Sequence, residues 1–430
     1  MAGTIYHPRR TIEEGAAIDH PVLQERPNSR AREGAAWRVD DVWRALSSIA
    51  PPVRTENVAL EGADGLIAAA DVAARRASPM AAVSAMDGYA VRDADLCGDI
   101  IRLRVAGRSF AGAGADAPLE PGCCMRVFTG ARIPANADRV IMQEDVVEQD
   151  GFIRICGGAR GKRHVRGVGS DFRRDDVLVA AGETFDARRL IAAAAADAAS
   201  VHVYARPRLS LIGAGDELVA PGSAGHCLDA IPESVTLGVA ALSRKWGGEI
   251  VGRKLVRDRL GDLRAAADAA IAVSDIVVVA GGASVGEKDF AKAMFAHLPL
   301  DIMVPKVALK PGKPIWLGRI GEKTIVGLPG NPTAAMVTAR LFLAPLLSIA
   351  RGGSARSALD FRTEAVLHEV ESCEGRETYL RAARDPLGVR VLNDQDSSAQ
   401  RALARADLLV RRREGAEALR AGDLVEVLEF

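Results

Sequence analysis

The stretch "DIVVVAGGASVGEKD", residues 275–289, joins an uninterrupted apolar run to a glycine-rich segment. An apolar run from Ile276 to Ala280, without polar alternation, is typical of a parallel strand that is covered on both faces. Gly281, Gly282 and Gly286 follow it, and glycine permits backbone conformations that other residues rarely adopt. The stretch therefore predicts a strand of a doubly wound α/β sheet, with a shaped loop at the carboxyl end where such sheets bind ligands.

Strands and helices alternate on both sides of this stretch. Strand-like runs lie at 208–213, 249–256 and 324–328, and helical patterns lie at 234–248, 260–273 and 331–347. Because alternating strands and helices form parallel sheets with helices on both faces, residues 206–350 are predicted to form one α/β domain.

The rest of the chain predicts a multidomain protein of α/β plus β class. A polar, Arg-rich start without periodicity indicates a mobile extension. Short β-like runs broken by Gly, Pro and Asn indicate β structure, and they interrupt two helical segments. The predicted parts besides the α/β domain are an N-terminal extension at 1–35, a helical linker domain at 36–71 and 176–205, an inserted β domain at 72–175 and a C-terminal β domain at 355–430.

The composition excludes several classes of protein. Lys+Arg and Asp+Glu are equal at 56 each and aromatic residues make up 4%, so a nucleic-acid partner is not expected. The six cysteines include no C-x-x-C pair, which argues against structural zinc. No apolar run appears long enough to span a bilayer, and the start lacks the apolar core of a signal peptide. We expect a cytoplasmic protein with no membrane partner.

Two further loops are predicted at the same edge of the sheet. Asparagine and proline favour the first positions of a helix, so "PGNP" would aim backbone N–H groups at a ligand. Of the other two loops, the one after residue 213 carries carboxylates and the one after residue 280 carries a hydroxyl group and a further carboxylate. Together these groups suit a phosphate-bearing ligand and a divalent cation. The candidate residues are Gly215, Asp216 and Glu217 in the first loop, Ser284 and Asp289 beside the glycines in the second, and Pro329, Gly330, Asn331 and Pro332 in the third.

A lysine-rich turn lies between the second and third loops. "KVALKPGKP", residues 306–314, contains Lys306, Lys310 and Lys313 and ends at Pro314. Each feature alone has a plainer interpretation: glycine loops as packing turns, Asp216 and Glu217 as a solvated turn, and the lysines as an exposed hairpin rim. Their convergence on one edge of one sheet favours an anion site. In the β region, Asp87 and Thr129 each precede a glycine, and alone both are ordinary turn residues.

Six motifs in order resemble the molybdopterin molybdenumtransferases, or molybdenum insertases, a family that includes the E domain of gephyrin. They are "SAMDGYAV", "FTGARIPANADRVIMQED", "GAGDELVAPG", "GGASVGEKD", "KPGKP" and "GLPGNP", and the resemblance covers residues 36–430. It implies a helical domain with an inserted β domain, a molybdopterin-binding α/β domain and a C-terminal β-barrel-like domain. It also implies a homodimer, with sites between subunits, that combines adenylylated molybdopterin with molybdate and Mg²⁺, releasing AMP.

The resemblance gives the candidate residues their roles. Asp87 and Thr129 would reach the partner subunit's α/β cleft, and Asp289 would bind the cation together with Glu233. Lys306, Lys310 and Lys313 would be the family's functional lysines around the KPGKP turn, of which Lys310 and Lys313 would meet an oxyanion. The segments "GRETYLRA" and "DQDSSAQ" would bring Arg381 and Ser397 or Ser398 to molybdate.

Four motifs depart from the family pattern. Glu233 and Val235 stand where an aspartate and an asparagine are usual, Ser170 replaces a carboxylate, and Ala334 replaces a serine; "GAGDE" also replaces Ser-Thr-Gly-Asp-Glu. Three hypotheses for the function remain open. The protein is an active insertase, a catalytically diverged molybdopterin-binding or scaffold paralogue, or a nucleotide-pyrophosphate hydrolase like the competence-damage proteins. The four-domain resemblance disfavours the hydrolase.

Overall fold

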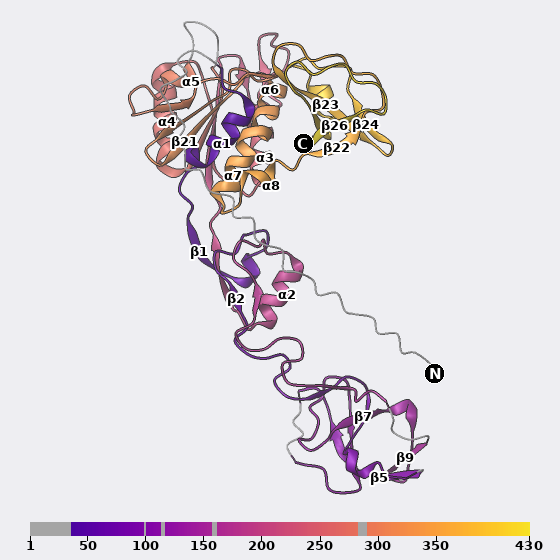
Figure 1. Ribbon diagram of the computed structural model, residues 1–430. Helices are drawn as coiled ribbons and strands as arrows, with labels where there is room; N and C mark the ends of the chain where they lie inside the picture. Colours follow the sequence, from indigo (N-terminus) through magenta and orange to yellow (C-terminus); the bar gives the residue numbers. More distant parts are fainter. Residues whose placement is uncertain (1–35, 99, 113–116, 157–160, 283–289) are drawn as a thin grey trace, which may run out of the picture. The chain divides into compact units, whose positions relative to one another are not determined.

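The computed structural model describes residues 36–98, 100–112, 117–156, 161–282 and 290–430 (Figure 1). The predicted extension at 1–35 lies outside the described residues, as do Ser284, Gly286 and Asp289.

The predicted α/β domain is built on one mixed sheet. Its first four strands are parallel, and its last two pair antiparallel with their neighbours. The parallel strands agree with the prediction from the sequence, whereas the antiparallel edge was not predicted. In spatial order the strands are β16 (Glu249–Val256), β13 (Arg208–Ala214), β17 (Ile276–Gly281), β21 (Lys323–Leu328), β20 (Trp316–Ile320) and β18 (Asp301–Val304).

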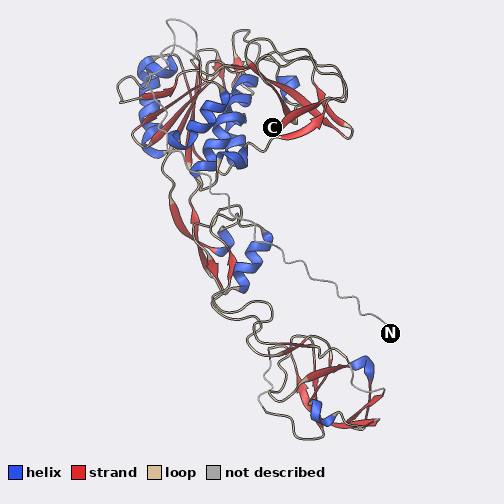
Figure 2. Cartoon of the chain, viewed as in Figure 1, coloured by secondary structure: helices blue, strands red, loops and turns tan. Residues whose placement is uncertain are grey.

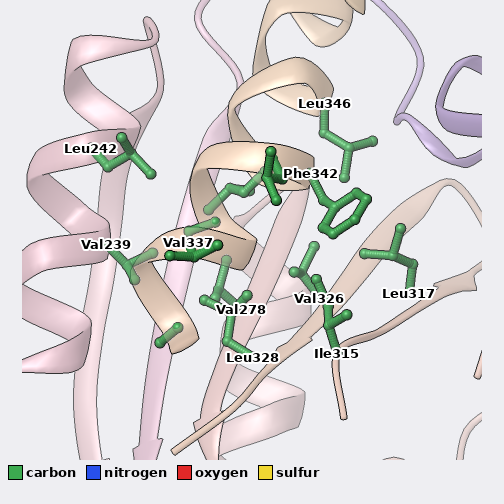
Figure 3. Close-up of a cluster of buried hydrophobic side chains, with 14 of the residues drawn as sticks. Val239, Leu242, Val278, Ile315, Leu317, Val326, Leu328, Val337, Phe342 and Leu346 are labelled. Atoms are coloured by element: carbon green, nitrogen blue, oxygen red, sulfur yellow. The ribbon is translucent and has the colours of Figure 1, made fainter. Parts of the chain in front are cut away.

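Strand β17 shows why this sheet needs helices on both faces. Ile276 and Val278 point into one buried apolar cluster, whereas Val277 and Val279 point into another. The first cluster contains side chains of α3 (Val235–Lys245), α6 (Pro332–Thr338) and α7 (Ala344–Ala350), part of which Figure 3 shows. The second contains side chains of α4 (Leu260–Val273) and α5 (Phe290–Ala293). The doubly wound arrangement is thus confirmed.

Helices α6 and α7 are joined by a π-helical turn, Ala339–Leu343, into one helix from Pro332 to Ala350. By length and composition this helix could cross a membrane, contrary to the expectation that no run is long enough. However, 89% of its most apolar window is buried inside the protein, as in the core helix of a globular domain.

Helix α1 (Val39–Ile49) buries its apolar face in the α/β domain. Val42 and Leu46 are fully buried in the cluster that also contains α3 and β17, and Trp43 donates from Nε1 to Leu341 O. From the sequence, α1 is predicted to belong to the helical linker domain, whereas its buried residues pack into the core of the α/β domain. Its amphipathic pattern predicts a buried face but does not identify the core that receives it.

The linker region and the inserted domain are rich in short strands (Figure 2). Helix α2 (Ala187–Ala195) and strands β1 (Thr55–Ala59) and β12 (Ser200–Tyr204) contribute to one small apolar core. Two-residue and three-residue strands connect this region with the inserted sheet: β2 (Val72–Ala73) with β11 (Val177–Val179), and β3 (Val83–Ser84) with β10 (Val165–Arg166). The inserted sheet runs β7 (Arg139–Met142), β4 (Gly88–Val91), β6 (Cys123–Val127), β5 (Ile100–Ser109), β9 (Phe152–Cys156), β8 (Val146–Gln149).

The C-terminal sheet includes a strand from outside the predicted C-terminal domain. That strand, β19 (Leu309–Lys310), belongs to the lysine-rich turn and pairs with β23. The lysine-rich turn is therefore fixed to the C-terminal sheet by backbone hydrogen bonding. The sheet order is β19, β23 (Glu377–Asp385), β25 (Leu408–Arg412), β26 (Leu424–Glu429), β22 (Arg362–Ala365), with β24 (Gly388–Val391) paired to β23.

Candidate active site

The loops after β13, β17 and β21 meet at the carboxyl edge of the α/β sheet. Gly281 has φ +89°, and a Cβ atom there would lie 2.3 Å from Ala214 O, at the end of β13. A Cβ atom on Gly330 would lie 3.5 Å from the Gly281 Cα atom. Glycine at 281 thus lets the strand ends approach closely, and the predicted convergence of these loops is confirmed for their described part.

The lysine-rich turn packs against the helix that follows the PGNP loop. Gly312 has φ +114°, and a Cβ atom there would lie 2.2 Å from Thr338 Cγ2. Only glycine allows this approach without displacing helix α6. The Lys310–Pro311 peptide bond is cis. The turn is thus held from one side by α6 and from the other by β23.

A pocket of about 550 Å³ opens between this turn, the PGNP loop and the C-terminal domain. It combines the lysine-rich turn and the PGNP loop with two segments of the C-terminal domain, at 376 and 395–397. Its lining residues are Leu309, Lys310, Pro311, Gly312, Lys313, Pro314, Pro329, Asn331, Ala334, Arg376, Gln395, Asp396 and Ser397.

The charges that face this pocket are mostly positive. Lys310 and Lys313 have no ion pair with any residue that the structure describes. Arg376 donates from Nη1 to Leu309 O at 3.4 Å and is otherwise exposed. The acidic group in the lining is Asp396, whose pKa is lowered because the Ser398 hydroxyl and backbone N–H donate to it. Three cations against one carboxylate suit an anionic ligand.

Asn331 joins the PGNP loop to the C-terminal domain. It occupies the N-cap position of α6 and Pro332 the first helical position, as predicted. Its side chain does not cap the helix, however; Nδ2 donates to Ser397 Oγ at 2.9 Å. Ser397 therefore lies at the pocket, whereas the Ser398 hydroxyl donates to Asp396 Oδ1 at 2.6 Å.

Arg381 lies behind the pocket and is 1% exposed. Its Nη1 donates to Thr333 Oγ1 at 3.2 Å and to Asp396 O at 2.9 Å, while Nη2 is buried without a hydrogen-bond partner. Burial is the main reason why the pKa of Arg381 is lowered. This arginine holds the loop that carries Asp396 and Ser397, while its Nη2 is left without a partner among the described residues.

Asp87 and Thr129 form a pair on the inserted β domain. The Thr129 backbone N–H donates to Asp87 Oδ1 at 2.7 Å and the Thr129 hydroxyl donates to the same oxygen at 2.9 Å. These two donors, the backbone N–H first, lower the pKa of the exposed Asp87 carboxyl group. The pair presents an ionised carboxylate at neutral pH.

Glu233 is 2% exposed and both its carboxylate oxygens are engaged at the start of α3. Oε1 accepts from Thr236 N at 2.5 Å and Oε2 accepts from Thr236 Oγ1 at 2.7 Å. Val235 is buried in the apolar cluster beside α3. These two departures from the family pattern therefore have a structural role, helix capping and core packing.

The other predicted residues that the structure describes do not line this pocket. Lys306 accepts a backbone hydrogen bond from Trp37 N, and Asp216 Oδ1 accepts from Asp258 N at 3.2 Å. Gly215, Glu217, Gly281 and Gly282 belong to the neighbouring strand-end loops. Arg376, Gln395 and Asp396 also line the pocket but were not predicted, although all three lie inside the segments "GRETYLRA" and "DQDSSAQ".

Three family regions match the chain in order. Residues 37–196 match the MoeA N-terminal region (domain I and II), residues 210–348 a probable molybdopterin binding domain, and residues 366–430 the MoeA C-terminal region (domain IV). The molybdopterin molybdenumtransferase of Haemophilus influenzae is 34% identical over 313 residues, which is 72% of this chain and 76% of that protein. The chain belongs to the molybdopterin molybdenumtransferase family.

Longer matches extend this family assignment to most of the chain. Molybdopterin molybdenumtransferase 1 of Mycobacterium tuberculosis is 29% identical over 432 residues, covering 90% of this chain and 98% of that one. A crystal structure of the molybdopterin biosynthesis MoeA protein from Pyrococcus horikoshii has a TM-score of 0.80 at 28% identity, covering 92% of this chain and 99% of that one. The multidomain family fold predicted from the motifs is thereby confirmed.

Proposed function

We propose that this chain is a molybdenum insertase that combines adenylylated molybdopterin with molybdate and releases AMP. Membership of the family supports a role in molybdenum cofactor biosynthesis. The observation that carries the finer proposal is the pocket in which Lys310, Lys313 and Arg376 face a single carboxylate. Both co-substrates are anions, so a site that receives them together must neutralise several negative charges.

Within the pocket, each group has a separate task. Lys310 and Lys313 come from one short turn that backbone pairing with β23 holds in place, so their charges lie near each other before any ligand binds. Asn331 and Ser397 form a polar bridge at 2.9 Å that can exchange hydrogen bonds with an oxyanion. Such fixed donors stabilise developing charge without reorganising during the reaction.

The described residues do not make a magnesium site by themselves. Among them there is no group of three or more His, Cys, Asp or Glu side chains that could hold a metal ion. Glu233 does not fit the predicted role, since Thr236 engages both of its oxygens and it is nearly fully buried. The proposal includes magnesium dependence through Asp289, which lies outside the described residues, and it assigns no metal-dependent step to the others.

The proposal is tested by AMP release from adenylylated molybdopterin and molybdate, followed by chromatography. Lys310→Gln/Lys313→Gln is expected to lower turnover about 100-fold, since the loss of even one preorganised donor commonly costs that much. Arg420→Gln, an exposed change on the C-terminal domain, is the matched control. Unchanged AMP release in the lysine variant would contradict the proposal.

The occupied carboxylate of Glu233 also favours a second candidate function, a molybdopterin-binding or scaffold protein that does not turn over. This function predicts tight binding of adenylylated molybdopterin with AMP release at background in the wild-type protein. Measuring binding and release on the same sample separates the two functions.

A further inference from the structure

A second pocket, of about 450 Å³, lies within the C-terminal domain. Its floor is apolar, because Val391 and Ala402 are 7% and 8% exposed. Its rim is basic. The lining residues are His368, Arg390, Val391, Leu392, Asn393, Asp394, Arg401, Ala402 and Arg405.

The arginines on the rim are mostly unneutralised. Arg401 and Arg405 make no ion pair and no side-chain hydrogen bond with any described residue, and Arg390 has only a long contact, Nη2 to Asp385 Oδ2 at 3.4 Å. The one acidic side chain of the lining, Asp394, accepts from Asp396 N at 3.0 Å. Three guanidinium groups against the Asp394 carboxylate of the lining and the Asp385 partner of Arg390 still leave a net positive charge at this pocket.

The type and spacing of these residues identify the ligand class. Arg401 lies on the short helix α9 (Gln400–Leu403), and Arg405 follows four residues later in the turn that ends it. One helical turn places residues i and i+4 on the same side. A guanidinium group presents several N–H donors in a rigid fork, which matches the oxygens of phosphate-like anions.

The loop 392–399 separates this pocket from the active-site pocket. Leu392, Asn393 and Asp394 face the arginine pocket, and the next residues of the loop, including Ser397, face the other. Gln395 fixes the loop between them: its Oε1 accepts from Arg381 N at 2.9 Å, and its Nε2 donates to Leu392 O at 2.7 Å. The two pockets therefore share one loop, which is fixed by Gln395.

We propose that the pocket formed by Arg390, Arg401 and Arg405 binds a tetrahedral oxyanion and thereby positions the loop that carries Ser397. The expected ligand is a compact, multiply charged anion. Inorganic phosphate and molybdate both belong to this class. This site is distinct from the Lys310 pocket and does not depend on the proposed insertase activity.

The test measures binding of inorganic phosphate alone and of molybdate alone to the full chain by equilibrium dialysis. The background is Lys310→Gln/Lys313→Gln, so that binding at the active-site pocket is weakened. Saturable binding is expected, and adding Arg401→Gln/Arg405→Gln should weaken it about tenfold, whereas adding Arg420→Gln should not. Comparable affinities for both anions would identify a general oxyanion site, and binding of molybdate alone would identify a substrate site.

Two results would overturn the proposal. One is an absence of saturable binding of either anion in the lysine background. The other is equal affinity with and without the two arginines, in protein that circular dichroism shows to be folded. Arg405→Gln alone provides a milder variant for the same comparison. The effect on the loop that carries Ser397 is measured by hydrogen exchange at 392–399. Exchange should slow when the anion is added in the lysine background, and it should not change in Arg401→Gln/Arg405→Gln. An unchanged exchange rate in the lysine background would show that the bound anion does not position the loop.

Discussion

Glu233 and Thr236 are joined by two hydrogen bonds, one to the backbone N–H and one to the hydroxyl of the threonine. The contact satisfies a free N–H group in the first turn of α3. Since both carboxylate oxygens are used, the additional methylene of Glu233, relative to aspartate, serves to reach Thr236. This geometry favours a capping role over the metal-binding role predicted from the sequence.

Glutamine at position 233 separates the two roles. Glu233→Gln keeps an oxygen for Thr236 N and an amide group for the Thr236 hydroxyl, but it removes the negative charge. Capping therefore predicts near wild-type unfolding midpoints and near wild-type AMP release, whereas a metal ligand would lose activity. Urea unfolding and AMP release are measured on the same preparations.

Glu233→Ala provides the contrast. It leaves Thr236 N and Oγ1 buried without partners and is expected to cost about 1–3 kcal/mol of folding free energy. If the alanine variant unfolds like the wild-type protein, the capping interpretation of Glu233 is wrong.

The sequence correctly predicted those helices and strands whose ranges are marked by local residue patterns. Helix α4 and strand β17 match their predicted ranges closely, because amphipathic or apolar runs of sufficient length are bounded by residues that end them. The antiparallel edge formed by β18 and β20 was missed, since the choice of partner strand depends on contacts that no local pattern encodes. The packing of α1 into the α/β core was missed for the same reason.

The residues of the candidate site also fall into two groups, those that local sequence signals predict and those that depend on contacts between distant segments. Lys310, Lys313 and Asn331 were foreseen because Pro-Gly turns mark their loops. The position of Arg376 in the pocket was not, because it follows from the parallel pairing of Leu309 with Glu377 between segments that are far apart in the chain. This pairing determines which side chain of "GRETYLRA" faces the lysines. The motif alone does not show it.

The pKa of Asp87 should depend on Thr129 in a graded way. Its folded-state pKa lies below 3.8, so the pair contributes stability above that value and loses the contribution as the pH falls through the folded-state pKa. Thr129→Val removes the hydroxyl but keeps the backbone N–H, which is the larger cause. The pKa of Asp87, measured by carbon-13 NMR, should therefore rise in this variant but stay below 3.8.

Thr129→Ser is the control, because serine retains the hydroxyl, and the pKa of Asp87 should match that of the wild-type protein. An unchanged pKa in Thr129→Val would show that the hydroxyl does not stabilise the carboxylate.

Arg411 should link α1 to the C-terminal sheet. Its side chain is 4% exposed, and its guanidinium group contacts Asp40 Oδ1 and Glu377 Oε1, each at 2.7 Å. Burial lowers the pKa of Arg411, but the interactions with Tyr379, Glu377 and Asp40 together raise it above the ordinary value. Removing one member of a buried ion pair leaves an unpaired charge and costs about 3–5 kcal/mol. Arg411→Ala is thus expected to lower the unfolding midpoint and to speed hydrogen exchange in α1.

Arg413→Ala tests the same neighbourhood without burial. Arg413 also contacts Asp40, at 3.7 Å, but its side chain is 57% exposed. An exposed pair contributes at most about 1 kcal/mol, so this variant should retain the exchange protection of α1. Equal effects of the two alanine variants would argue against a specific role for Arg411.

Sites shared between subunits remain a prediction that mixing can test. Asp87→Ala removes a group predicted to act in the partner subunit's cleft, and Lys310→Ala removes one from the α/β side. Neither homodimer should release AMP efficiently. Exchanged heterodimers contain one intact combination and should recover activity, up to about half of the wild-type rate per dimer. Absence of recovery in confirmed heterodimers would count against shared sites.

The two arginines of β23 and its preceding turn should differ in what they control. Arg376 is exposed at the pocket, so Arg376→Gln should raise the KM for molybdate about tenfold through the loss of one charge-assisted contact, with little change in unfolding. Arg381 is buried and supports the loop of Asp396, so Arg381→Gln should lower the unfolding midpoint and speed hydrogen exchange at 392–399. Steady-state kinetics with varied molybdate and exchange measurements on both variants check this. A different result would contradict this assignment: Arg381→Gln raises the KM for molybdate, Arg376→Gln does not, and residues 392–399 stay protected from exchange. In that case Arg381, through its unpaired Nη2, would contact molybdate instead of Arg376.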